Sequence, residues 1–366
     1  MQFEEFGKKF ENELKAFEKM SKAAGARSDY VQGGGGNTSV KFDDSLMAIK
    51  ASGYRLGQIA VDDGYAVLNY GNIAKWYDST DPEALSDIEA EGSAMAKSNI
   101  DTPDGMKALR PSVEAGFHSI LRKYVLHTHP VYANLITCSD CGKDVIDKAL
   151  EGMPYTYAVI PAINPGASLT FAIKNELDSV EKTTGKRPQI IFLMNHGLVA
   201  TDDDPEVCAK IHNEVNARCA RAFGIDETVW NEPSIKPCPC GTPERWVSAT
   251  DYLADRIKAG FFNMKLMCED ALYPDQLVFL NGSVEMRSTD DGKECTMPCT
   301  IFEDTGKVVY VGKESSSLTI EQTLCAIAFI YENVAKSGYS IVPMTGSGKD
   351  FISNWESEKY RKQLNN

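Results

Sequence analysis

Apolar residues near the start of the chain recur at three- and four-residue intervals among charged ones. Phe3, Phe6, Phe10, Leu14, Phe17 and Met20 follow this spacing, and Gly25 comes soon after them. Such spacing is the apolar stripe of an amphipathic helix, and glycine is common just past a helix end. The pattern therefore predicts one helix over residues 3–22.

Short apolar runs then alternate with longer helical patterns. Strands are predicted at residues 38–42, 46–49, 124–127, 157–163 and 189–201, and helices at residues 112–121, 130–138, 167–178 and 205–223. Alternating strands and helices indicate the α/β class. Because the strands are short and many are joined by turns, we expect a mainly antiparallel sheet rather than a doubly wound parallel one.

A segment rich in proline and cysteine, NEPSIKPCPCGTPERW, begins at Asn231. The chain has 366 residues, which is more than one average domain needs. We predict a first domain over residues 1–225, a linker over 226–247 and a smaller α+β domain of unknown role over 248–366. The last domain is expected to contain helices at 248–270, 319–336 and 348–363, a strand at 276–280 and a strand-turn-strand at 297–312.

Composition excludes some classes of function. The net charge is −14, whereas nucleic-acid-binding proteins usually carry a basic face. No stretch approaches the roughly 18 apolar residues of a membrane span. The N-terminal residues include acidic ones from Glu4 on and lack the apolar core of a signal peptide. We expect a cytoplasmic protein that binds neither nucleic acid nor a membrane.

The ten cysteines are more than is usual for a cytoplasmic chain. Three pairs are close in sequence: Cys138 and Cys141, Cys238 and Cys240, and Cys295 and Cys299. The pairs lie too far apart along the chain for a zinc-ribbon spacing. We expect free, reduced thiols, with Cys238 and Cys240 as the best place for a structural metal or a redox role.

Three of the five histidines are predicted at strand ends. His127 and His129 form a His-x-His pair, and residues two apart on a strand point to the same face. His196 follows the apolar run QIIFLM, with Gly197 beside it allowing a sharp turn. Three imidazoles with an open fourth position describe a catalytic zinc site. The alternative is a set of structural strand-end histidines, and we interpret His118 and His212 as structural.

Two further features have an interpretation as part of a site. Glu114 is predicted at a helix start shortly before the strand that contains His127, where it could act as a base or as a metal ligand; otherwise it is a solvated helix-start residue. Gly33 to Gly36 precede Asn37, Thr38 and Ser39. This run could form an anion-binding nest or simply a flexible turn.

These motifs together resemble a known family. GGGGNTSVKF, KASG, RPSVE, HTHP and NHGLVATDDD occur in this order, and the chain is similar to the class II aldolase/adducin family over residues 5–225. The likeness is greatest to the aldolase part of rhamnulose-1-phosphate aldolase/short-chain dehydrogenase fusion proteins. LYPDQLVFL (272–280) and NWESEKYR (354–361) also fit that likeness.

The resemblance implies a fold and a set of roles. The fold would be an α/β/α sandwich with a central, mainly antiparallel sheet. His127, His129 and His196 would bind zinc or another divalent metal, and Glu114 would be the catalytic acid/base. The substrate phosphate would lie against the cradle of Gly36, Asn37, Ser52, Gly53 and Ser112, and the protein would be a homo-oligomer, usually a tetramer.

The implied reaction is the cleavage of a ketose 1-phosphate, such as rhamnulose or fuculose phosphate. The products would be dihydroxyacetone phosphate and an aldehyde, formed through an enediolate that the metal stabilises. An epimerase or dehydratase acting on a sugar phosphate is an alternative, because the same histidine site serves these reactions in the family. A non-catalytic adducin-like scaffold is a second alternative, although adducin-type members lose the metal ligands.

Some details depart from the family pattern. Val113 stands where sugar-phosphate aldolases often have a second serine, which weakens the phosphate assignment. No motif locates the tyrosine acid of the family, for which Tyr155 and Tyr157 are the residues to consider. We expect no NAD binding, because no dinucleotide fingerprint is present, and GSGK (346–349) lacks the rest of a P-loop.

Overall fold

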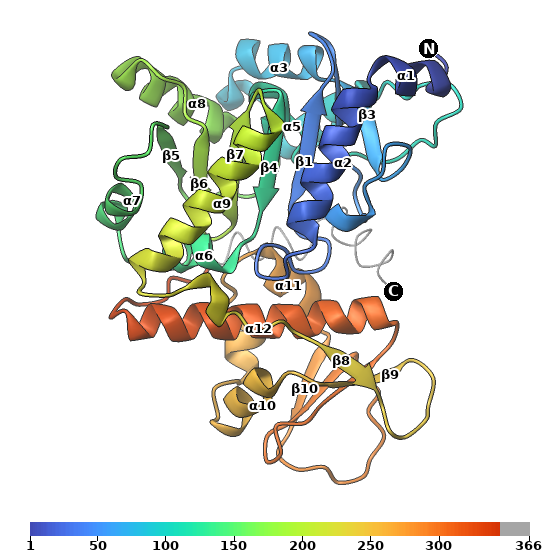
Figure 1. Ribbon diagram of the computed structural model, residues 1–366, viewed down its shortest axis with the longest axis vertical. Helices are drawn as coiled ribbons and strands as arrows, with labels where there is room; N and C mark the ends of the chain where they lie inside the picture. The colour runs from blue at the N-terminus through green and yellow to red at the C-terminus, as the bar shows by residue number, and fades with distance from the viewer. Residues whose placement is uncertain (345–366) are drawn as a thin grey trace. The chain divides into compact units, whose positions relative to one another are not determined.

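A computed structural model describes residues 1–344 of the chain (Figure 1). These residues form two compact units, and each unit contains several stretches of chain. The first unit contains Met1–Arg27, Gly36–Thr128 and Leu150–Asn216. The second contains Ser28–Gly35, His129–Ala149 and the described residues from Ala217 onward. Two short stretches of the N-terminal part of the chain thus belong to the second unit.

A seven-stranded sheet forms the centre of the first unit, in the order β3-β2-β1-β4-β7-β6-β5. Neighbouring strands are antiparallel, except for the parallel pair β5 and β6. The strands are β1 (Asn37–Lys41), β2 (Leu46–Lys50), β3 (Tyr65–Asn69), β4 (Tyr124–Thr128), β5 (Tyr157–Ile160), β6 (Ile190–Leu193) and β7 (Gly197–Asp202). The expected mainly antiparallel sheet is confirmed.

Helices cover both faces of this sheet. They are α1 (Phe3–Lys9), α2 (Glu11–Gly25), α3 (Tyr70–Ser79), α4 (Ile88–Ser98), α5 (Ala115–Ile120), α8 (Ala167–Thr184) and α9 (Pro205–Ala222), with 3-10 turns η1 (Leu56–Gln58) and η2 (Pro82–Ala84). Helices α3, α5 and α8 share apolar cores with the strands. Figure 1 shows α2 and α9 in front of the sheet, and α2 contacts β1 and β4. The α/β/α sandwich is therefore confirmed.

Three local predictions in the first unit need correction. The N-terminal stripe forms two helices, because the backbone leaves the helical region at Phe10 (φ −115°, ψ 27°). The apolar run predicted as one strand over 189–201 is a hairpin of β6 and β7, because Asn195 adopts a left-handed conformation between them (φ 54°). Strand β3 was not among the predicted strands.

The second unit contains a five-stranded sheet in the order β10-β11-β12-β9-β8. Its strands are β8 (Ile235–Pro237), β9 (Arg245–Ser248), β10 (Val284–Arg287), β11 (Cys299–Phe302) and β12 (Val308–Val311). Its helices are α6 (Val131–Thr137), α7 (Lys143–Ala149), α10 (Asp251–Lys258), α11 (Pro274–Leu280) and α12 (Glu314–Lys336), with a 3-10 turn η3 (Glu227–Val229) and a π-helical turn η4 (Lys265–Glu269). Helix α12 packs against α6, α10 and α11.

Two segments of the C-terminal part have a different structure from the one predicted. Residues 226–247, predicted as a linker, contain η3, β8 and the start of β9. Residues 276–280, predicted as a strand, belong to helix α11. Every residue of this helix is buried, and a short apolar run does not distinguish a buried strand from a buried helix. The helix predicted at 348–363 and the segments 346–349 and 354–361 lie outside the described residues.

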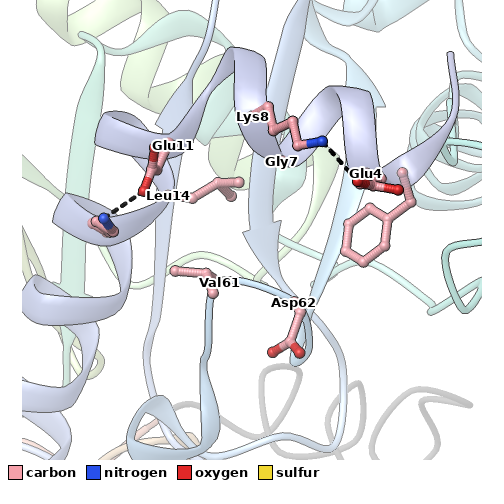
Figure 2. Close-up of a pocket in the computed structure, with 9 residues that line it drawn as sticks. Glu4, Gly7, Lys8, Glu11, Leu14, Val61 and Asp62 are labelled. Atoms are coloured by element: carbon pink, nitrogen blue, oxygen red, sulfur yellow. Dashed lines mark hydrogen bonds and ion pairs between the residues drawn. The ribbon is translucent and has the colours of Figure 1, made fainter.

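The outer surface of the first unit has a pocket of about 490 Å³ beside α1 and α2 (Figure 2). Four of its charged lining residues pair along the helices, with Lys8 Nζ 2.6 Å from Glu4 Oε1 and Lys15 Nζ 2.5 Å from Glu11 Oε1. These i,i+4 pairs are ordinary features of an exposed helix surface. Within residues 1–344, no helix is long and apolar enough to cross a membrane.

Candidate metal centre

The three predicted histidines come together. His127 lies in β4, His129 follows directly after its end, and His196 lies in the turn between β6 and β7. One ring nitrogen of each lies within 4.8 Å of the others, and all three side chains are buried. Strand β4 pairs with β7, with Thr128 opposite Leu198. The turn before β7 therefore lies at the same end of the strands as the C-terminal end of β4.

The backbone fixes the tautomer of His127. Its Nδ1 lies 3.0 Å from the carbonyl oxygen of Leu198. A carbonyl can only accept, so Nδ1 carries the hydrogen and the lone pair is on Nε2. The rings of His127 and His196 meet edge to face, with centroids 5.0 Å apart. His127 is thus prepared to bind a cation through Nε2.

Glu114 faces two of the histidines. Its Oε2 lies 3.5 Å from His127 Nε2 and its Oε1 lies 3.4 Å from His196 Nε2. The residue is buried directly before α5, and its side chain does not cap that helix. Within the described part of the chain, Oε1 has no hydrogen-bond partner. The alternative of a solvated helix-start glutamate is therefore wrong.

A buried polar chain holds the other carboxylate oxygen. Asn37 Nδ2 donates to Glu114 Oε2 at 2.5 Å and lies 3.1 Å from Ser112 Oγ. The Asn37 side-chain oxygen is hydrogen-bonded to His118 Nε2, and His118 Nδ1 lies 2.7 Å from Ser39 Oγ. Burial, with smaller contributions from His127 and Lys41, lowers the pKa of His118 well below its ordinary value. A neutral His118 can donate from Nε2 to Asn37 and so orient its amide toward Glu114.

Two residues predicted for the phosphate cradle, Asn37 and Ser112, are hydrogen-bonded to Glu114. The Ser52 N–H donates to Arg110 O at 2.8 Å, and the Ser112 N–H donates to Lys50 O at 3.2 Å. These bonds join the strand end before Gly53 to the segment before Glu114. Gly36 has a φ of 65°, and a Cβ there would lie 2.5 Å from the His127 carbonyl oxygen. Glycine is needed at this position because the backbone passes so close to β4.

The other predicted residues have simpler surroundings. His212 is buried, and its Nε2 lies 2.6 Å from Thr128 Oγ1, so it supports the end of β4. The positive φ of the β6–β7 turn is at Asn195, whereas Gly197 is the first residue of β7. All ten cysteines are free. Burial raises the pKa of Cys138 to about 12.

The donor set suits a divalent metal. Three buried imidazoles match the ligands of catalytic zinc, and Glu114 Oε1, which has no hydrogen-bond partner in residues 1–344, lies beside His196. A buried carboxylate oxygen with no partner is costly unless a cation or proton compensates it. A metal at the trio would supply that compensation. Within residues 1–344, one group of His, Cys, Asp or Glu side chains is close enough together to hold a metal ion. It consists of His127, His129 and His196.

Comparison with known proteins decides the family. The profile of the class II aldolase and adducin N-terminal domain matches residues 19–223. The chain belongs to the class II aldolase and adducin family. The recognition made from the sequence motifs is therefore confirmed. Aldolases of this family are metal-dependent enzymes, and this chain has the buried histidine trio.

The chain is similar to three known proteins. The chain is 27% identical over 187 residues to a 3-oxo-tetronate 4-phosphate decarboxylase of Haemophilus influenzae, covering 48% of this chain and 70% of the relative. The N-terminal class II aldolase domain of a Thermoplasma acidophilum protein is 25% identical, with a TM-score of 0.46, covering 56% of this chain and 91% of that one. A sugar-phosphate aldolase from Thermotoga maritima is 15% identical, with a TM-score of 0.40, covering 58% of this chain and 94% of that one.

Proposed function

We propose that this protein is a zinc-dependent aldolase acting on a ketose 1-phosphate, with a deoxysugar such as rhamnulose or fuculose phosphate as the substrate class. Its products would be dihydroxyacetone phosphate and an aldehyde. The observation that carries the proposal is the position of the buried Glu114 carboxylate, with Oε1 3.4 Å from His196 Nε2. A carboxylate there can reach a carbon atom of a substrate bound beside the trio.

His127, His129 and His196 would hold the metal. When bound, it acts as a Lewis acid that polarises the substrate carbonyl and favours the enediolate left by carbon–carbon cleavage. Glu114 then moves the proton to or from the enediolate carbon. Asn37 keeps one oxygen of Glu114 engaged through its hydrogen bond and leaves Oε1 for this transfer.

The phosphate would be held by Gly36, Asn37, Ser52, Gly53 and Ser112. Support comes from the backbone pairing that brings the segments of Ser52 and Ser112 together and from the positive φ of Gly36 and Gly53. Backbone amides and hydroxyls in such conformations can bind phosphate oxygens. Anchoring the phosphate would fix the distance from the reacting carbons to Glu114.

Decarboxylation is the second candidate, because a decarboxylase is among the curated relatives. Loss of carbon dioxide from a 2-hydroxy-3-oxo acid phosphate turns the carbonyl and its hydroxyl-bearing neighbour into an enediolate, as aldol cleavage does. The metal would again act as the Lewis acid, and Glu114 would again transfer the proton. The two reactions differ in the group that leaves, which is an aldehyde or carbon dioxide.

The test is product analysis with purified protein before and after metal removal. Ketose 1-phosphates would be assayed for triose phosphate release, and a 3-oxo-tetronate 4-phosphate for carbon dioxide release. The proposal expects triose phosphate and aldehyde to form in equal amounts. This activity should be lost when a chelator removes the metal and should return when Zn²⁺ is added. Release of carbon dioxide alone would establish the second candidate, and an epimer without cleavage would overturn both.

A homotetramer and a cytoplasmic location stay predictions.

A further inference from the structure

The second unit contains a partner for one of the histidines. Asp275, in the first turn of α11, has its Oδ2 2.6 Å from His129 Nδ1. His129 is 3% exposed and Asp275 is 0% exposed. The carboxylate accepts, so Nδ1 carries the hydrogen and the lone pair of His129 is on Nε2.

The two strand-end histidines thus have the same tautomer but different partners. His127 donates to a neutral carbonyl, that of Leu198, whereas His129 donates to a carboxylate. A hydrogen bond to a charged acceptor is stronger and makes the imidazole more electron-rich. His129 is therefore the better electron donor of this pair.

Neighbouring contacts fix the position of Asp275. Tyr273 donates from its hydroxyl to Gln32 Oε1 at 3.0 Å. Gln276 accepts from the Leu272 N–H at 2.9 Å and donates to Leu266 O at 2.7 Å. These bonds hold the residues on both sides of Asp275, so the carboxylate is presented to His129 by a rigid segment.

Gly35 leaves the space that this pair needs. A Cβ at Gly35 would lie 2.1 Å from Asp275 Oδ2 and 3.1 Å from His129 Nδ1. The φ of Gly35 is outside the left-handed region, so space rather than backbone strain requires glycine. One glycine of the four-residue run is thus explained by the Asp275–His129 pair rather than by a phosphate.

We infer that Asp275 is a positioning residue of the metal centre, which holds His129 in its Nε2-ligating tautomer and strengthens its bond to the metal. This inference rests on the proposed metal site at His127, His129 and His196. It gives the C-terminal part of the chain a role in metal binding through α11. Groups that position histidine ligands typically change metal affinity by about 10- to 100-fold.

The test measures Zn²⁺ affinity of the full-length apoprotein by competition with a chromogenic chelator. Asp275→Asn keeps an acceptor but removes the charge, and Asp275→Ala removes both. Gly35→Ala would push the carboxylate away from His129. We expect affinity to fall in the order wild type, Asp275→Asn, Asp275→Ala, by about 10- to 100-fold at the end of the series, with Gly35→Ala also weakened.

The control is Glu321→Gln. Glu321 is another fully buried carboxylate of the second unit, hydrogen-bonded to Ser248 Oγ at 2.7 Å and to the Tyr310 hydroxyl. The affinity of the Glu321→Gln variant for Zn²⁺ should equal that of the wild type. The absorption spectrum of bound Co²⁺ gives a second readout, which should change in the Asp275 variants and stay unchanged in Glu321→Gln.

The outcomes are distinguishable. If the wild type binds Zn²⁺ and both Asp275 variants bind it equally well, this inference is wrong while the proposed function stands. If the wild type binds no metal, the proposed metal site fails and the inference fails with it. Should Asp275→Ala not fold, the near-isosteric Asp275→Asn decides by the same criterion.

Discussion

Glu114 Oε1 lies 3.4 Å from His196 Nε2, and no donor among residues 1–344 satisfies it. A fold that excluded cations from this place would leave the carboxylate uncompensated, at a cost of several kcal/mol. This pair lies at the point where we propose that a metal, a substrate and a proton-transfer group meet. The first predictions concern this point.

Glu114→Gln is expected to retain metal and lose turnover by about 100- to 10,000-fold, which is the usual contribution of a general acid or base. The amide keeps an oxygen for the Asn37 hydrogen bond but cannot take up a proton. Metal content and steady-state turnover would be measured on the same preparation. Wild-type turnover in the variant would remove Glu114 from the mechanism.

His196→Ala is expected to lower the metal content of the purified protein, because one of three imidazole ligands is lost. Glu321→Gln is the control, since Glu321 is buried and is hydrogen-bonded to Ser248 and Tyr310 rather than to the trio. Elemental analysis of both variants is the measurement. Equal metal content in His196→Ala and the control would argue against the trio.

Asn195 controls the turn that presents His196. Its φ of 54° is tolerated by asparagine and glycine, whereas other residues lose about 1–2 kcal/mol in this conformation. Asn195→Val should therefore lower the free energy of unfolding by about that amount and weaken Zn²⁺ binding. Asn195→Gly should preserve Zn²⁺ binding. Equal behaviour of the two variants in denaturant unfolding and metal titration would contradict this account of the turn.

His212 should make the fold sensitive to acid. Burial lowers its pKa to about 3 from an ordinary value of 6.5. Between these values the unfolded chain binds a proton that the native chain does not, so stability is lost as the pH falls below about 6.5. This one group contributes a slope of up to about 1.4 kcal/mol per pH unit. Urea unfolding at several pH values should show a shallower dependence in His212→Gln, and an identical dependence would refute the prediction.

Cys240 should be the most reactive thiol among those described. It is exposed, and its hydrogen bond with Cys238 is the main cause that lowers its pKa to about 7. Iodoacetamide at neutral pH should label it first, while the buried Cys138 stays unmodified in the native protein. Cys238→Ala should slow the labelling of Cys240. Peptide mapping by mass spectrometry gives the rates, and an unchanged rate in Cys238→Ala would disprove the role of Cys238.

The sequence by itself located most strands of the first unit and the three histidines of the proposed metal site. Alternation along a strand put His127 and His129 on one face, and the apolar run before His196 predicted a strand end at this residue, which lies in the turn after β6. These are local relationships, which the period of a strand determines. The order of the motifs supplied the family and Glu114.

The tertiary structure alone decided how the site is supported. Asp275 is 146 residues from His129 in sequence, and no local pattern relates the two. The apolar run at 276–280 fits a buried strand as well as a buried helix. Only packing in the second unit shows that α11 forms there and places Asp275 beside His129. His118 likewise contacts Asn37 only because α5 packs beside β1. Spacing along a chain specifies which face a side chain takes, but the partner it meets there depends on packing between distant segments.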